Sequence, residues 1–185
     1  MTRRWTVRFG GFGGQGIVLS SVVLGLAGVH DGKYVCQRAS YGSEARGGKC
    51  KSEVIISDEE ISYPLIDNLQ ILVIMSQQAL DQYLDELSEG GLLIVDPDMV
   101  EEVKRKDLRV INIPAARKAD ELGNRIVANM IMLGALQAAT GIVTKESLYR
   151  AMKESVASRF VELNVKAIAV GEELEKDLLR ARRGN

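Results

Sequence analysis

The fold is decided by residues 5–19, WTVRFGGFGGQGIVL, in which a strand pattern, a glycine-rich turn and the start of an apolar run follow one another. Residues 5–10 predict a β-strand, and residues 11–16 a tight turn. The apolar run 17–29 is long enough for a helix. Asp31-Gly32 ends it, because glycine readily adopts the left-handed conformation at a helix C-terminus. A second strand over residues 33–40 completes a strand–turn–helix–strand unit, in which the two strands are expected to be parallel.

The pattern continues with further strands separated by turns and helices. The run 71–75 is apolar throughout, as in strands that a parallel sheet buries on both faces. Ser76 or Gln77 can begin a short helix, expected to carry Leu80, Leu84 and Leu87 and to end at Gly90-Gly91. The other expected strands are 49–57, a short antiparallel return at 61–63, then 92–95 and 109–113.

From about residue 115 onward the pattern is helical. Residues 124–140 are apolar on most faces, as in a helix that is buried or covered by a partner. Thr144 is a suitable N-cap for the next helix, and a final amphipathic helix ends in a basic tail. The expected fold is α/β: a single domain over 1–185, with a Rossmann-like, mostly parallel sheet flanked by helices and a helical C-terminal third over about 115–185.

Composition and charge exclude several classes of function. The formal net charge of -1, without a basic stripe, disfavours nucleic-acid binding through phosphate neutralisation. No apolar run reaches the roughly 18 residues that a membrane span requires. The N-terminal residues lack the apolar core of a signal peptide and run directly into a strand pattern, so a cytoplasmic protein is expected.

The two cysteines, Cys36 and Cys50, do not form a C-x-x-C pair. Two thiolates cannot supply the four ligands of an ordinary iron–sulfur cluster, and the chain has no zinc-site spacing. They are expected to be reduced thiols in or near strands. If the protein belongs to a redox enzyme, its clusters are carried by another chain.

Residues 11–16 match G-x-G-x-x-G between a strand and a helix. In that setting the glycines allow a tight turn, close approach of a phosphate to the backbone and close helix–strand packing, with helix N–H groups facing the anion. The alternative is a turn that needs glycine for packing alone. The dinucleotide fingerprint also requires an acidic residue at the end of the second strand. Asp31 precedes that strand, which disfavours NAD, whereas Arg38 suits a ribose phosphate such as that of NADP or coenzyme A.

The loop after the second strand, YGSEARGG over residues 41–48, joins three glycines to two charged side chains. Ligands of open α/β sheets bind beyond such strand ends. The guanidinium of Arg46 offers a fork of donors to a carboxylate or phosphate, and Glu44 can orient it. A surface ion pair between Glu44 and Arg46 is the alternative, and residue chemistry alone does not separate the two.

Together these two motifs resemble the gamma subunit of the 2-oxoacid:ferredoxin oxidoreductases. The resemblance covers roughly residues 4–175 and includes the segments 52–57, 123–130 and 133–136. The opening residues and the chain length are most similar to the 2-oxoglutarate branch, with the pyruvate, branched-chain and indolepyruvate branches as alternatives.

The resemblance implies that different subunits of one enzyme carry the different cofactors. These enzymes oxidatively decarboxylate a 2-oxo acid to an acyl-CoA and reduce ferredoxin. Thiamine diphosphate lies on the alpha and beta subunits, and iron–sulfur clusters on beta or a ferredoxin-like delta subunit. The gamma subunit is implied to help cover the active site, to contribute to the coenzyme A site and to be inactive alone. For the chain isolated from its partners, a homodimer that takes their place is a separate expectation. No catalytic and no metal-binding residue is expected here. The implied cofactor-binding residues are Gly11, Gly13, Gly14, Gln15, Gly16, Arg38, Tyr41, Gly42, Glu44, Arg46, Gly47 and Gly48.

Three polar residues outside the two motifs have structural interpretations. His30, the only histidine, is expected at a helix C-terminus, where a cation is favourable. Asn124 and Asn129 flank one helical turn, and Asn129 in an apolar stretch must find hydrogen bonds, with a loop backbone or with a partner or ligand. Two rival functions remain: a free-standing NAD(P)-binding Rossmann enzyme, and an assembly module that binds no small molecule.

Overall fold

The first forty residues form the expected strand–turn–helix–strand unit. The computed structural model describes residues 3–41 and 49–183. In it, β1 (Arg4–Phe12) leads through the glycine-rich turn into α1 (Ile17–His30), and β2 (Tyr34–Tyr41) follows. Asp31 caps α1, and Gly32 adopts a positive φ of 73°, as predicted for the helix end.

The six strands form one sheet with the order β2-β3-β1-β4-β5-β6. β1 pairs in parallel with β4, β4 with β5, and β5 with β6, so the mostly parallel Rossmann-like sheet is confirmed. β3 is antiparallel to both β1 and β2 and lies between them. β1 and β2 therefore point the same way without being neighbours. The remaining strands are β3 (Lys49–Ser57), β4 (Leu69–Ile74), β5 (Leu87–Val95) and β6 (Arg109–Asn112).

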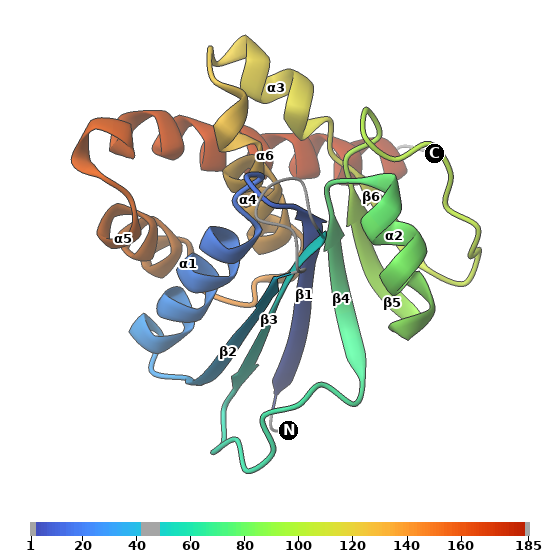
Figure 1. The fold of residues 1–185 in the computed structure, drawn as a ribbon. Coiled ribbons are helices and arrows are strands. Elements are labelled where there is room, and N and C mark those ends of the chain that lie inside the picture. Colours follow the sequence, from blue (N-terminus) through green and yellow to red (C-terminus); the bar gives the residue numbers. More distant parts are fainter. Residues whose placement is uncertain (1–2, 42–48, 184–185) are drawn as a thin grey trace.

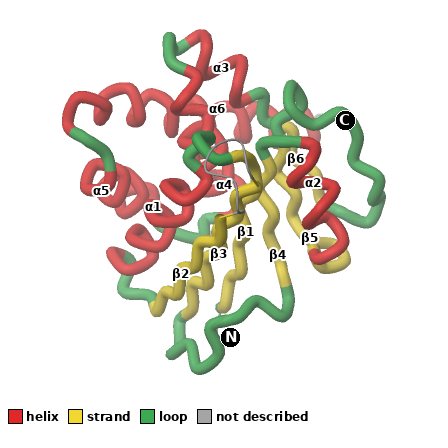
Figure 2. Tube along the Cα trace, in the orientation of Figure 1, coloured by secondary structure: helices red, strands yellow, loops and turns green. Residues whose placement is uncertain are grey.

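Helices cover the two faces of the sheet unequally. α1, α4 (Ala128–Thr140), α5 (Lys145–Ser155) and α6 (Val161–Arg183) belong to the larger core cluster on one face. On the other face, α2 (Gln77–Tyr83) packs over β1 and β4, and with side chains of β4 and β5 it forms a smaller cluster. The two layers are visible in Figure 1 and, by element type, in Figure 2, with α3 (Ala115–Glu121) above the strand ends. The helical C-terminal third is confirmed. Among the described helices, none combines the length and apolar character that crossing a bilayer requires.

Two predicted elements were wrong. Leu87 was expected in a helix but begins β5, because the helix ends at Tyr83 and Gly90 takes its positive φ of 69° inside the strand. Residues 61–63 were expected to return as a strand but form none. Instead, the guanidinium of Arg4 donates hydrogen bonds to the backbone carbonyl oxygens of Tyr63 and Leu65.

α4 and α6 pack backbone to backbone through two glycines. A Cβ built on Gly134 of α4 would overlap the carbonyl group of Ile168, and one built on Gly171 of α6 would overlap that of Ile131. Only glycine permits such an approach. The C-terminal helix is therefore an integral wall of the core.

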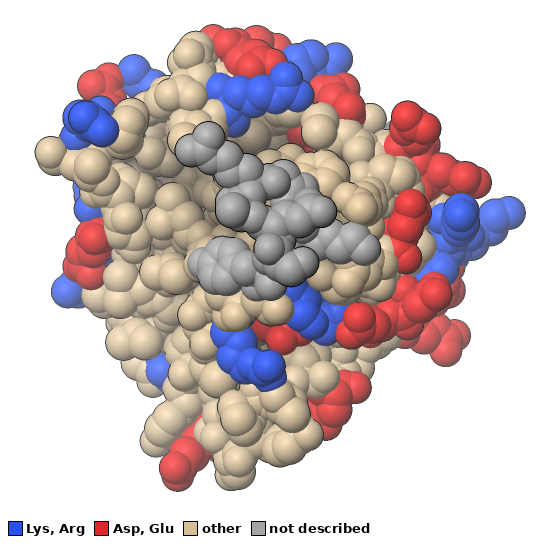
Figure 3. Space-filling view, in the orientation of Figure 1, with Lys and Arg blue, Asp and Glu red and all other residues tan. Residues whose placement is uncertain are grey.

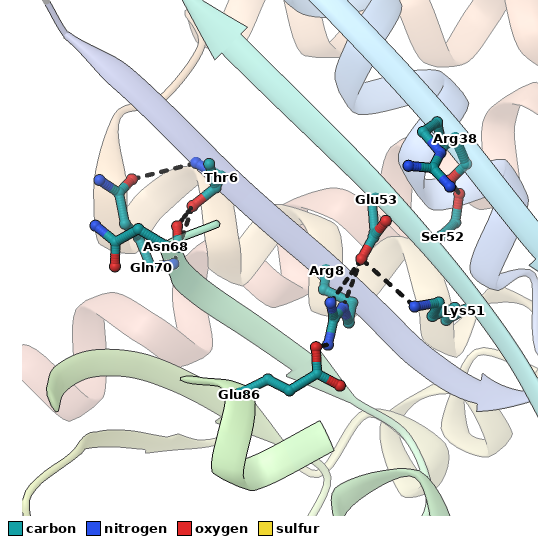
Figure 4. A network of polar contacts seen from close by, with 9 residues as sticks. All are labelled: Thr6, Arg8, Arg38, Lys51, Ser52, Glu53, Asn68, Gln70 and Glu86. Carbon is teal, nitrogen blue, oxygen red and sulfur yellow. Dashed lines mark hydrogen bonds and ion pairs between the residues drawn. The ribbon is translucent and has the colours of Figure 1, made fainter. Parts of the chain in front are cut away.

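The face of β1 and β3 opposite α1 is polar. Arg8 is 3% exposed, and its guanidinium lies 2.7 Å from Oε1 of Glu53 and 2.7 Å from Oε2 of Glu86. Lys51 approaches the same oxygen of Glu53 at 3.7 Å. Figure 4 shows the contacts that join Arg8, Glu53, Glu86 and Lys51. The ring of Tyr83 lies 5.1 Å from the Arg8 guanidinium carbon. A buried arginine is tolerated here because two carboxylates neutralise it.

Candidate functional site

The glycine-rich turn connects the carboxyl end of β1 to the N-terminus of α1. Gly14 and Gly16 have positive φ values of 98° and 74°, which L-residues with side chains rarely adopt. Gly13 and Gly14 are exposed, and a Cβ built on Gly14 would have no atom within 4 Å. The turn thus presents bare backbone to solvent at its tip, where an anion or a flat ligand group can approach it.

Gln15 clamps this turn to the neighbouring strand. Its Oε1 accepts the backbone N–H of Phe12 at 2.6 Å, and its Nε2 donates to the carbonyl of Met75 at 2.9 Å. A Cβ on Gly11 would overlap Oε1 of Gln15, which explains the glycine at that position. Gln15 therefore supports the turn from within, and both ends of its amide are already occupied by backbone groups.

Asn129 supports the turn from the other side. It is 2% exposed on α4, and its Nδ2 donates to the carbonyl of Gly16 at 3.1 Å. A Cβ on Gly16 would overlap that amide nitrogen. Of the two interpretations of Asn129, the hydrogen bond to a loop backbone is confirmed. Asn124 caps the helical turn before α4, its Oδ1 accepting the N–H of Ile126 at 3.1 Å.

A pocket of about 260 Å³ opens beside the turn. It lies beyond the carboxyl ends of β1, β4 and β5, where α1 and α2 leave β1 and β4 toward opposite faces of the sheet. Open α/β sheets bind ligands at such a switch point. The lining residues are Gly14, Gln15, Met75, Asp96, Met99, Ala116, Arg125, Ile126 and Ala128.

Asp96 forms the floor of this pocket. It is fully buried, its Oδ2 accepts the N–H of Ala116 at 2.7 Å, and its Oδ1 accepts the N–H of Asp98 at 2.9 Å. Burial raises the pKa of Asp96, against the lowering effect of these two hydrogen bonds. Oδ2 therefore fixes the start of α3 and Oδ1 fixes the turn after β5, so the carboxyl group has a structural role.

Arg125 supplies the positive charge at the pocket. Its side chain is 63% exposed, with Nη1 3.6 Å from Oδ2 of Asp120 and Nη2 3.6 Å from the sulfur of Met99. Ile126 beside it is 60% exposed. The mouth of the pocket thus combines one largely exposed guanidinium with apolar side chains, a combination suited to a ligand with both anionic and apolar parts.

Sequence reasoning found the turn but missed most of the pocket. Met75 and Asp96 directly follow the buried strands β4 and β5, a position that could have pointed to them. Arg125 and Met99 come from segments that only the tertiary fold brings to the turn.

The other predicted binding residues lie elsewhere. Arg38 is two strands away from β1, level with Glu53 and Arg8 in the sheet register, and does not line the pocket. Its backbone carbonyl accepts the hydroxyl of Ser52 at 2.9 Å (Figure 4). Tyr41 is the last residue of β2 and pairs with Cys50, which pairs in turn with Gly11 at the end of β1. The predicted residues Gly42, Glu44, Arg46, Gly47 and Gly48 lie outside the described residues.

Two ionisable residues at the C-terminal end of α1 have structural partners. Nε2 of His30, at the end of α1, lies 2.9 Å from Oε2 of Glu154 on α5. Asp31 accepts hydrogen bonds from the N–H and hydroxyl of Thr144, each at 2.6 Å, and from the hydroxyl of Ser147 at 2.5 Å. Because these bonds tie Asp31 to the N-terminus of α5, it cannot serve as the ribose-binding acid of a dinucleotide site.

The described cysteines do not fit a shared metal cluster. Cys36 pairs with Ile55 across β2 and β3, whereas Cys50 lies five residues further along β3. At about 3.3 Å per strand residue, their Cα atoms are separated by about 16 Å. Both thiols are free, and the described part of the chain contains no group of three or more His, Cys, Asp or Glu residues that could hold a metal ion.

The sheet order, the glycine-rich turn and the pocket at the switch point define the chain as a Rossmann-like α/β protein. A profile of the pyruvate ferredoxin/flavodoxin oxidoreductases matches residues 6–174. The chain belongs to this family.

Relatives and solved structures agree with that assignment. The chain is 49% identical over 179 residues to the 2-oxoglutarate synthase subunit KorC of Methanothermobacter marburgensis, covering 92% of this chain and 96% of the relative. The crystal structure of a keto/oxoacid ferredoxin oxidoreductase gamma subunit from Geobacter sulfurreducens matches with a TM-score of 0.84 and 39% identity, over 94% of this chain and 99% of that one.

A third comparison shows the same fold within a larger protein. It is the 2-oxoglutarate:ferredoxin oxidoreductase from Magnetococcus marinus, solved with 2-oxoglutarate, coenzyme A and succinyl-CoA bound. The match has a TM-score of 0.87 and 22% identity and covers 95% of this chain but 31% of that one. The likeness shows that the fold recurs as roughly a third of a longer polypeptide.

Proposed function

We propose that this chain is the gamma-type subunit of a 2-oxoglutarate:ferredoxin oxidoreductase. The complex would oxidatively decarboxylate 2-oxoglutarate, transfer the acyl group to coenzyme A and reduce ferredoxin. The observation that carries the proposal is the 49% identity to a 2-oxoglutarate synthase subunit over nearly the whole of both chains. The two free thiols agree with a reducing compartment, and the proposal places the complex in the cytoplasm.

In this proposal the reactive cofactors lie on other subunits. The family resemblance assigns thiamine diphosphate to alpha and beta subunits and the clusters to beta or a ferredoxin-like delta subunit. The separation of Cys36 and Cys50 along the sheet supports this, because they cannot share one cluster. The chain is accordingly expected to be inactive alone.

The contribution of this chain would be part of a shared coenzyme A site. The exposed backbone of Gly13 and Gly14 and the guanidinium of Arg125 suit the phosphates of coenzyme A, and the methionine and isoleucine side chains suit its apolar parts. At about 260 Å³ the pocket is smaller than the roughly 300–1,000 Å³ that enclose a drug-sized ligand. It would therefore hold one portion of coenzyme A, with neighbouring subunits holding the rest.

The bend over residues 41–48 would complete this site. Its flanking residues Tyr41 and Lys49 end β2 and begin β3 at the same edge of the sheet as the glycine-rich turn. We propose that the guanidinium of Arg46 binds a coenzyme A phosphate, with Glu44 orienting it. Arg46→Ala in the assembled complex should raise the KM for coenzyme A, and an unchanged KM would remove Arg46 from the site.

The proposal is tested by assembly and turnover. The chain is co-expressed with the neighbouring genes of its source, and the purified complex is assayed with 2-oxoglutarate, coenzyme A and a low-potential electron acceptor. Activity should require all subunits and should favour 2-oxoglutarate over pyruvate and branched-chain 2-oxo acids. Turnover by the isolated chain would contradict the proposal, as would a complex that prefers pyruvate.

The rival hypothesis, a free-standing NAD(P)-binding enzyme, is tested by titrating the isolated chain with NADH and NADPH. Asp31 is bound to α5, and Asp96, the only acid among the described lining residues of the switch-point pocket, has both oxygens hydrogen-bonded to backbone N–H groups. The isolated chain should therefore not bind NADH or NADPH at micromolar concentrations. Fluorescence of the reduced nicotinamide during titration measures this. Micromolar binding would favour the rival function.

A further inference from the structure

β2 is an edge strand with little protection. It has one neighbour in the sheet order, and it pairs with β3 in unbroken register from Tyr34 to Tyr41. Natural proteins usually blunt an exposed edge with prolines, bulges, charges or shortness. β2 has eight residues, no proline and no break in its register. Within the described residues, its outer edge therefore offers backbone donors and acceptors that a further strand could pair with.

The helix beside this edge is apolar on its outer side as well. α1 contains no Asp, Glu, Lys or Arg. At about 100° per residue, Val18, Val22 and Val29 fall within roughly 40° of one another and form one stripe. Val22 is 40% exposed and Val29 54% exposed. A helix that is apolar all round is normally covered on every side.

The stripe and the edge form one continuous surface, here called the α1–β2 surface: Val18, Val22, Val29 and the outer edge of β2. α1 lies directly on β2, because a Cβ built on Gly28 would be 2.9 Å from Cγ2 of Val35 and one on Gly25 would be 3.3 Å from its Cγ1. Figure 1 shows α1 alongside β2 at the edge of the sheet. In the same orientation, Figure 3 shows few charged atoms over α1 itself, with Lys, Arg, Asp and Glu along the margin of the molecule beside it.

One positive charge projects from the same edge strand. Arg38 is exposed, and within the described residues its guanidinium has neither a hydrogen bond nor an ion pair. Its cross-strand neighbour Glu53 is already bonded to Arg8 and also approached by Lys51. A carboxylate placed beside Arg38 by a docking strand would meet a cation that is not paired with any described residue of this chain.

We propose that the α1–β2 surface binds another subunit of the oxidoreductase, which adds a strand to the edge of β2. That strand would bury the valine stripe under apolar side chains and set a carboxylate against Arg38. This inference rests on the proposed function. A different subunit is the favoured occupant because the relative that this chain matches over nearly its whole length is itself named as one subunit of an enzyme, 2-oxoglutarate synthase.

A second copy of this chain fits the surface less well. In a symmetric antiparallel pairing, the same strand meets itself, so residues near its centre come opposite their own copies. Arg38 lies near the middle of β2 and would face, directly or diagonally, the Arg38 of the second copy. Like charges opposite each other on a sheet are destabilising.

Hydrogen exchange tests the strand addition without any substitution. Amide exchange is measured by mass spectrometry for the free chain and for a complex whose 2-oxoglutarate activity has been demonstrated. Amides of β2 that point away from β3 should exchange at least tenfold more slowly in the complex, while amides of the central strand β4 should not change. Unchanged β2 exchange in an active complex would overturn this inference and leave the proposed function standing. If no subunits assemble with the chain, both fail.

Matched substitutions test the stripe and the charge. The pair Val22→Asp and Val29→Asp should weaken binding to the remaining subunits by more than tenfold, measured by sedimentation, since charges would be buried in an apolar interface. The near-isosteric pair Val22→Thr and Val29→Thr should stay within about threefold of wild type. Arg38→Glu should weaken binding and Arg38→Lys should largely preserve it. Equal affinity of the Asp pair and wild type would overturn the proposal. So would a dimer of the isolated chain that the Asp pair disrupts while the complex still assembles normally.

Discussion

The side-chain amide of Asn129 donates to the carbonyl of Gly16 over 3.1 Å, joining the start of α4 to the N-terminus of α1. The two residues are 113 positions apart in the chain. Together with Gln15, which holds the other end of the turn to Met75, this bond fixes the glycine-rich turn from two sides. The turn is thus a rigid element set in place by the core, and several consequences can be measured.

Replacing the donor of Asn129 should destabilise the protein. Asn129→Asp turns an N–H that faces a carbonyl into a carboxylate oxygen in a buried position, and we expect a loss of about 1–3 kcal/mol in the free energy of unfolding. Chemical denaturation of the isolated chain measures it. Asn68→Asp is the control, since Asn68 is exposed and its oxygen can still accept from Ser88. Equal stability of the two variants would contradict the role of the Asn129 bond.

Two glycines with the same backbone conformation separate strain from overlap. Gly16 and Gly32 have φ values of 74° and 73°, but a Cβ on Gly32 meets nothing within 4 Å, whereas one on Gly16 overlaps the amide of Asn129. Gly32→Ala should cost about 1 kcal/mol for the left-handed backbone alone. Gly16→Ala should cost at least roughly 1–2 kcal/mol more, because the Asn129 hydrogen bond is displaced as well. Similar melting temperatures for the two variants would show that the Asn129 side chain can move aside without a loss of stability.

The contribution of the buried Arg8 on β1 to the stability of the protein should depend on its carboxylate partners. Arg8→Met leaves Glu53, whose side chain is 12% exposed, without its main cation, and should cost about 3–5 kcal/mol. The double variant Arg8→Met with Glu53→Leu should recover most of that loss, since neither charge then remains buried. A double-mutant cycle by urea denaturation gives the coupling energy. As a control, Lys166→Met in an exposed pair on α6 should leave the denaturation midpoint unchanged. Additive losses for Arg8 and Glu53 would disprove the coupling.

Stability should depend on pH through Asp31. Partial burial alone would raise the pKa of Asp31, but hydrogen bonds from Ser147 and Thr144 and the charge of Lys33 outweigh it and leave the pKa below its ordinary value of 3.8. A lowered pKa contributes stability that is fully present above that ordinary value and is lost as the pH falls through the folded-state pKa. Because solvent screens the contacts of this partly exposed carboxylate, Asp31→Asn should cost only about 1 kcal/mol at neutral pH.

The same reasoning sets the pH profile that checks Asp31. The stability difference between wild type and Asp31→Asn should shrink below about pH 4, because the wild-type carboxylate then becomes protonated. Ser147→Ala removes one of the hydrogen bonds to Asp31 and should show a smaller difference with the same trend. Thermal melts between pH 3 and pH 7 measure both variants. A difference that stays constant over this range would rule out Asp31 as the source.

The affinity of the complex for coenzyme A should fall when residues at the tip of the glycine-rich turn or beside it are substituted. Gly14→Ala places a methyl group in open space at the pocket, and Arg125→Ala removes its guanidinium. In the assembled complex each should raise the KM for coenzyme A by about fivefold to tenfold, on the order of one charge-assisted hydrogen bond, with little effect on the KM for 2-oxoglutarate. Arg150→Ala, on the outer side of α5, is the control. A change confined to kcat would argue against a binding role.

The sequence predicted correctly those turns, helix starts and N-caps that depend on a few neighbouring residues. The turn at residues 11–16, the helix from Ile17 and the caps at Ser76 and Thr144 follow from glycine spacing, apolar periodicity and hydroxyl caps within a few residues. Leu87 was misassigned because Gly90 was interpreted as a helix breaker, although it lies within β5. Which strand inserts between β1 and β2 depends on pairing across the sheet and was not visible in the sequence.

The candidate site was only partly predictable for the same reason. The glycines of the turn carry their own signature, but Asp96 and Arg125 reach the pocket through the ends of other elements. Arg38 looked suitable for a phosphate from its position at the end of a strand, yet the intervening β3 carries β2 away from the turn. A residue's distance along the chain therefore says little about its distance from this pocket.

The glycine contact between α4 and α6 has a consequence for biosynthesis. Because Gly134 and Gly171 let the two backbones touch, α4 has no finished binding surface until the last helix has left the ribosome. Asn129, which anchors the turn, sits on that same α4. The nascent chain must therefore extend beyond Gly171 before the turn is fixed, and a polypeptide terminated before α6 would expose an incomplete apolar core.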